Sequence, residues 1–80
     1  MSPTVFNHKG YHFFFFSHEE SRIHVHVHCS DGEAKFWLDP VVALAVSEGL
    51  NKKQLKDIHK IVEDRQDEIK KSWKKHFRDS

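Results

Sequence analysis

Three histidines at alternate positions, His24, His26 and His28, are the residues of this 80-residue sequence best suited to carry chemistry. Alternate residues of a β-strand point to the same face and lie about 6.6 Å apart. Two imidazoles so placed can serve as general acid and general base on a phosphodiester or acyl group. Alternatively, they can bind a divalent metal such as zinc, with a further ligand from elsewhere. The spacing leaves both chemistries open.

The segment after these histidines predicts their neighbours. Asp31-Gly32 is a strong signal for a two-residue turn, so residues 23–29 and 33–39 are expected to form a hairpin. Directly opposed residues of such a hairpin share a face. The predicted pairs on the polar face are His28–Lys35, His26–Trp37 and His24–Asp39. The apolar residues between them fall together on the other, buried face.

These pairs assign a role to each polar residue. His24 and His26 are the predicted acid–base pair, and Lys35 would stabilise developing negative charge. Asp39, opposite His24, would orient its ring and favour its charged form, which makes His24 the acid and His26 the base. Trp37 offers a flat surface on which a base or a cation can stack. For the metal alternative, the ligands would be His24, His26 and His28.

The rest of the sequence predicts the frame that holds this hairpin. Further strands are expected over residues 4–8, 11–17 and 41–47, and the four phenylalanines of residues 13–16 predict a strand covered on both faces. Asn51, with Gln54 three residues later, predicts the capped start of a helix over about residues 52–77. The predicted fold is one α+β domain, residues 1–80. In it, an antiparallel or mixed sheet of four to five strands packs against one long C-terminal helix.

Charge is divided unevenly between the two halves of the chain. Residues 1–40 carry three basic and five acidic side chains, whereas residues 41–80 carry ten basic and seven acidic ones. The run from Lys70 to Arg78 is basic without an acid. Such a run is either a solvated helix end or a site for an anionic partner such as RNA. The candidate binding residues there are Lys71, Lys74 and Lys75.

The composition of the chain indicates the cellular compartment in which the protein works. A single cysteine, Cys29, excludes an internal disulfide and suits a reducing compartment. The N-terminus does not resemble a signal peptide, and no apolar stretch approaches the roughly 20 residues that span a bilayer. We therefore expect a cytoplasmic protein with no membrane contact. A domain this small has a thin core, so a partner protein or homo-oligomerisation would add stability.

Several segments of the chain together resemble domain-of-unknown-function family 4160. They are residues 1–5, Tyr11–Ser17, His24–Val27, Gly32–Leu38 and Trp73–Phe77. In that resemblance His24 and His26 match a His-x-His-Val motif, and Lys35 matches an Ala-Lys-aromatic-Trp-Leu strand. Arg22-Ile23 stands where prolines are expected, and His28 lies beyond the motif, which ranks it below the other two histidines.

The resemblance also implies a biological setting. Members of the family are short bacterial proteins, often encoded beside a second small protein of domain-of-unknown-function family 2442. That arrangement is similar to a toxin–antitoxin module and implies a toxin role for this chain. Its partner would be the cognate, family 2442-like antitoxin encoded nearby.

The leading prediction is therefore a toxin that acts on RNA as a metal-independent ribonuclease or another RNA-directed enzyme, with no cofactor. Two alternatives stay open. One is a histidine-rich module that binds a divalent metal. The other is a non-enzymatic interaction domain that docks through its sheet face or an edge strand.

Overall fold

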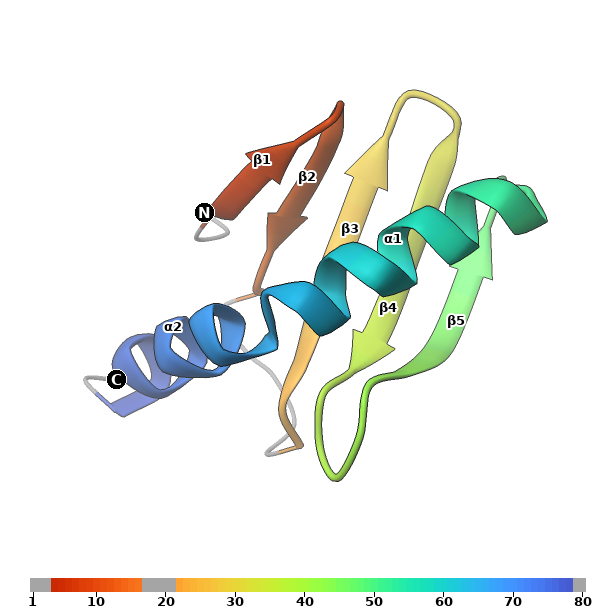
Figure 1. Ribbon diagram of the computed structural model, residues 1–80. Helices are drawn as coiled ribbons and strands as arrows, with labels where there is room; N and C mark the ends of the chain where they lie inside the picture. Colours follow the sequence, from red (N-terminus) through yellow and green to blue (C-terminus); the bar gives the residue numbers. More distant parts are fainter. Residues whose placement is uncertain (1–3, 17–21, 79–80) are drawn as a thin grey trace.

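The computed structural model describes residues 4–16 and 22–78, which form an antiparallel sheet followed by two helices (Figure 1). The strands are β1 (Thr4–His8), β2 (Tyr11–Phe14), β3 (His24–Cys29), β4 (Gly32–Trp37) and β5 (Ala43–Glu48), and the helices are α1 (Lys52–Asp64) and α2 (Gln66–Arg78). The spatial order of the strands, β1-β2-β3-β4-β5, follows their order in the sequence. The α+β class and the antiparallel sheet are confirmed.

The first hairpin is closed by Lys9-Gly10. His8 pairs with Tyr11, so the turn has two residues, and both have positive φ angles of 51° and 83°. Two consecutive positive φ angles define the turn whose twist matches that of the flanking strands, and glycine occupies the second position without strain. β2 is shorter than predicted, because it ends at Phe14; Ser17 lies outside the described residues.

The second hairpin keeps the predicted faces, but its predicted register is wrong by two residues. Cys29 pairs with Gly32, so the turn residues are Ser30 and Asp31. The observed pairs on the polar face are His24–Trp37, His26–Lys35 and His28–Glu33. A shift of one residue would move every side chain to the other face, whereas a shift of two preserves the faces and changes every partner.

Gly32 shows why the turn lies one residue earlier than predicted. A Cβ atom at Gly32 would meet the backbone carbonyl oxygen of Glu48 and would lie 2.9 Å from the carbonyl carbon of Gly49. The glycine therefore serves a close approach between β4 and the end of β5, and it is not part of the turn. Close backbone approach is a common use of glycine within strands.

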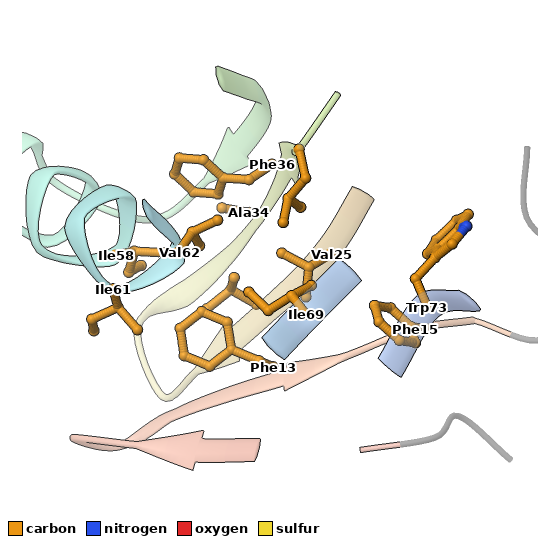
Figure 2. Close-up of a cluster of buried hydrophobic side chains, with 12 residues drawn as sticks. Phe13, Phe15, Val25, Ala34, Phe36, Ile58, Ile61, Val62, Ile69 and Trp73 are labelled. Atoms are coloured by element: carbon orange, nitrogen blue, oxygen red, sulfur yellow. The ribbon is translucent and has the colours of Figure 1, made fainter. Parts of the chain in front are cut away.

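The core lies between one face of the sheet and the two helices (Figure 2). Its buried side chains are Phe13, Phe15, Val25, Val27, Ala34, Phe36, Leu38, Ile58, Ile61, Val62, Ile69 and Trp73. The phenylalanine run is not covered on both faces as predicted: Phe13 and Phe15 are buried, but Phe14 is half-buried and Phe16 is exposed. Two aromatic rings therefore remain on the face that turns away from α1.

The helical region divides into two helices where one was predicted. Asn51 caps α1 as expected: its Oδ1 atom accepts from the backbone N–H of Gln54, and the Gln54 Oε1 atom accepts from the backbone N–H of Asn51. The helix ends at Arg65, whose φ of −114° and ψ of 18° leave the helical region, and α2 begins at the next residue. The apolar stripe continues across this break, because Val62 before it and Ile69 after it are both buried.

Neither helix of the described residues is long and apolar enough to cross a membrane.

Candidate functional site

The polar residues of the hairpin belong to the sheet face turned away from α1, which we call the open face. Across the sheet they form three rows. Two rows run over all of β2 to β5: Phe14–His26–Lys35–Val46 and His12–His28–Glu33–Glu48. The third joins His24 to Trp37 on β3 and β4. The open face therefore carries cations and aromatic rings at the His24 end, and carboxylates at the other.

His24 shares the direction of the other histidines but is fully buried, with 0% of its surface exposed. β2 pairs with β3 only as far as His26, so His24 lies beyond the end of that pairing. There the Trp73 ring of α2 packs against the imidazole, with ring centroids 4.9 Å apart, and Trp37 packs at 5.5 Å. The prediction that His24 stands on an accessible face is wrong, because an aromatic side chain from the second helix covers it.

The hydrogen bond of His24 fixes its tautomer. The Nδ1 atom lies 2.7 Å from the backbone carbonyl oxygen of Arg22, which can only accept, so Nδ1 carries the proton. The Nε2 atom is also buried. The ring cannot touch a substrate from this position. Its centroid lies 5.2 Å from that of His26, so it can instead support the neighbouring histidine.

Asp39 does not oppose His24, because Trp37 occupies that place. Asp39 is exposed and follows the end of β4, and its backbone carbonyl oxygen accepts a hydrogen bond of 2.8 Å from the Nε atom of Arg22. The predicted pairing of Asp39 with His24 is therefore wrong. The two-residue shift in register accounts for the whole of this change.

His26 and Lys35 form the accessible centre of the open face. They oppose each other directly on β3 and β4, and both are half-buried. The imidazole contacts two phenylalanine rings, that of Phe16 at 4.3 Å and that of Phe14 at 5.6 Å between centroids. These four side chains line a pocket of about 300 Å³, together with Val46 and two acidic residues, Glu33 and Glu48. The pocket thus combines an acid–base group, a cation and aromatic surface with two carboxylates.

Trp37 lies beside this pocket and contacts two cations. The guanidinium carbon of Arg22 is 4.2 Å from the centroid of the indole ring, and the Nζ atom of Lys35 is 4.4 Å from it. Both distances fall within the range of cation–π attraction. Trp37 and Lys35 were predicted from the sequence as site residues, whereas Arg22, Phe14 and Phe16 were not. The alternation of phenylalanines along β2, with every second ring on the polar face, is the signal that could have identified the last two.

Comparison with protein-family models matches residues 10–74 to the family described as Domain of unknown function (DUF4160). This span covers most of the chain. The chain belongs to the DUF4160 family. The predicted resemblance is therefore confirmed. No curated protein and no solved structure matches the chain.

The third histidine of β3, His28, is exposed and lies between His12 and Glu33 in its row. His12 in turn is within 2.9 Å of the Thr4 hydroxyl oxygen. Within residues 4–16 and 22–78, no group of three His, Cys, Asp or Glu side chains is arranged to hold a metal ion. A zinc–nitrogen bond is about 2.0–2.1 Å long, so three rings spaced along one strand cannot share one ion without rearrangement.

The basic surface of the DUF4160 domain lies on α2. Lys71, Lys74 and Lys75 are exposed, as expected for a polar helix face opposite a buried stripe. Their helix is anchored at the His24 end of the sheet by the contact between Trp73 and His24. The predicted basic residues therefore lie on the element next to the cationic end of the open face, and not beside its acidic row.

Proposed function

We propose that this DUF4160 domain is the toxin component of a bacterial toxin–antitoxin pair and that it acts on single-stranded RNA at the open face. The toxin role is supported by the family's resemblance to one member of a two-gene module. The RNA-directed role is supported by the pocket: it places His26 and Lys35 against two phenylalanine rings. That juxtaposition is the observation that carries the proposal.

The aromatic side chains favour an unpaired nucleic acid strand. A base can stack on an aromatic ring only when it is free of its own partner, and open sheet faces with exposed aromatic side chains are a recurrent RNA-binding surface. Phe16 is 45% exposed at the rim of the pocket and can take a base without any change in the core. Trp37 holds two cations against its ring and so places positive charge beside this stacking surface.

The charged side chains of the open face would determine the direction in which a bound RNA strand runs. Lys35 and Arg22 lie towards the His24 end, whereas Glu33 and Glu48 form the row at the opposite end. Apart from the reacting phosphate, which would lie between His26 and His28, the phosphates would therefore follow the cations towards α2. A domain with a net charge of only +1 is a weak general binder, so a local arrangement of this kind matters more than the total.

The accessible residues support transesterification within RNA. His26 would take the proton of a ribose 2′-hydroxyl while the 2′-oxygen bonds to phosphorus, and Lys35 would stabilise the charge on the phosphoryl oxygens. The bond from phosphorus to the 5′-oxygen breaks, and His28 would give that oxygen its proton. In the observed register Lys35 opposes the base and Glu33 opposes the acid. His24, being buried, would be a positioning residue in place of the acid first predicted for it.

Growth inhibition and RNA cleavage test this proposal together. Variants are compared at matched expression in a bacterial host, with circular dichroism to confirm folding. His26→Ala is expected to abolish toxicity and RNA cleavage, and His8→Ala, a histidine on β1, is the matched control. Cleavage is expected to persist in the presence of a chelator. Full toxicity of a folded His26→Ala protein would exclude the catalytic role and favour a non-enzymatic interaction domain.

Phe16 tests the stacking surface separately. Phe16→Leu keeps an apolar side chain but removes the aromatic face. Because stacking contributes about 1–3 kcal/mol per base, we expect binding of a labelled single-stranded RNA to weaken about 5- to 150-fold. Fluorescence anisotropy on tag-free protein measures this change. Equal affinity of the wild type and Phe16→Leu would show that the pocket does not stack a base.

A further inference from the structure

Strand β5 is an exposed apolar edge of the sheet. Among the described strands it pairs only with β4, so its outer backbone groups face away from the sheet (Figure 1). Leu44 and Val46 on the strand are 43% and 58% exposed, and Val41 just before it is 66% exposed. Edge strands are usually protected by lysine, proline or a bulge. Residues 43–48 contain neither lysine nor proline and have only an irregularity in register near Leu44.

A groove runs beside this edge on the helix side of the sheet. It has a volume of about 570 Å³ and an apolar floor that includes Phe36, Leu44 and Leu55. Lys56 and Lys60 of α1 lie along it and are exposed. Two carboxylates, those of Glu63 and Asp64, also line the groove, and that of Glu63 lies 3.6 Å from the Nε2 atom of His59.

The charge of α1 beside β5 indicates which occupant fits. The helix follows β5 after a three-residue connection, and its first three turns expose four lysines and one carboxylate: Lys52, Lys53, Lys56, Asp57 and Lys60. A second copy of the chain that paired β5 with β5 would bring the same basic surface to the interface, and not a complementary one. Like charges that face each other across an interface oppose association. A partner strand that carries carboxylates has the complementary charge.

We infer that β5 and the adjacent groove form a docking site for an extended segment of an acidic protein partner, which adds a strand to the sheet. Backbone hydrogen bonds to β5 supply affinity, and alternate side chains supply specificity. On the helix side, glutamate or aspartate stems cover Leu44 while their carboxylates approach Lys56 and Lys60. On the open face, apolar side chains pack on Val46. This inference does not rest on the proposed RNA chemistry, since it uses no residue of the acid–base centre.

Two synthetic peptides of about ten residues, a little longer than a typical strand, test the site. One alternates valine with glutamate and the other alternates valine with lysine. We expect the acidic peptide to bind the wild-type protein and to protect the outer amides of β5 from hydrogen exchange. The Val46→Glu variant places a negative charge at an exposed position and should weaken binding of the acidic peptide at least about tenfold. Asn7→Glu on β1, the opposite edge, is the matched control and should bind normally.

Charge reversal gives a second, independent readout. The double variant Lys56→Glu with Lys60→Glu should reverse the preference, so that the lysine peptide binds better than the acidic one. The same reversal at Lys74 and Lys75 on α2 is the control and should leave the preference unchanged. Equal binding of both peptides by all variants would overturn the inference. So would a wild-type dimer that Val46→Glu converts to a monomer, because β5 would then bind a second copy of this chain.

Discussion

The burial of His24 makes its role in folding measurable apart from any role in activity. The imidazole is fully buried between Trp37, Trp73 and His26, and its Nδ1 atom donates to the Arg22 carbonyl oxygen. His24→Ala removes this ring and leaves a cavity. Truncation of large buried side chains costs about 2–5 kcal/mol, and loss of a hydrogen bond typically costs about 1 kcal/mol. We therefore expect the free energy of unfolding to fall by about 3–5 kcal/mol.

That loss is large for a domain of this size. In domains of 60–100 residues, about 1 kcal/mol lowers the melting temperature by roughly 4–8 °C, so His24→Ala should melt at least about 10 °C below the wild type. His26→Ala, at a half-buried position, should cost less than about 1 kcal/mol. His24→Asn can retain a donor for the Arg22 carbonyl oxygen and should fall between the two.

Urea denaturation followed by circular dichroism measures all three variants under the same conditions. The decisive comparison is the difference between the two alanine variants. If His24→Ala is as stable as His26→Ala, the ring does not fill the interior as described. The placement of Trp73 over β3 would then be wrong as well. If the difference appears, loss of toxicity in His24→Ala reports unfolding and not the loss of a catalytic group.

Three further changes test the fold and the basic helix. Trp73→Ala, at a residue only 7% exposed, should cost about 3–5 kcal/mol in urea denaturation, and a cost below about 1 kcal/mol would contradict its burial. Gly32→Ala would drive a methyl group into the backbone of β5 and should cost at least about 1–3 kcal/mol, whereas a stability like that of the wild type would contradict the close approach. Replacing Lys71, Lys74 and Lys75 by glutamine should weaken RNA binding and flatten its dependence on salt by up to about 0.7 in slope per lost phosphate contact. An unchanged slope would make these lysines solvated surface.

The second hairpin shows what the alternation of apolar and polar residues can and cannot predict. Alternation of Val25 and Val27 with the histidines is enough to predict which residues are buried, because side chains of a strand have a period of two. The same period cannot separate two registers that differ by two residues. Only the role of Gly32 separates them, and that role depends on how closely Glu48 approaches it. This contact joins residues far apart in the sequence, so no local pattern reveals it.

The burial of His24 could not be predicted from the sequence for a similar reason. Alternation predicts the direction in which a side chain points, but not what covers it. Two tertiary features bury the His24 ring. β2 ends at Phe14, and the helix is interrupted at Arg65, so that α2 can place Trp73 against β3. The apolar stripe of the helical region is continuous across Arg65. It therefore predicted which residues are buried but gave no sign of the break between the two helices.

The open face and the edge of the sheet meet at β5, which links the two proposals physically. Val46 lines the pocket that contains His26 and Lys35, and it is also the exposed side chain on which a docked strand would pack. A strand added to β5 would extend the wall of the pocket outward by one strand spacing, about 4.8 Å. The carboxylates of that strand would lie on the helix side of the sheet, near Lys56 and Lys60, and its apolar side chains would cover Val46 at the rim of the pocket. A partner bound at the edge would therefore restrict access to the open face without contacting His26 or Lys35. The partner would then neutralise the domain by binding at β5, beside the pocket, and not by occupying the pocket itself.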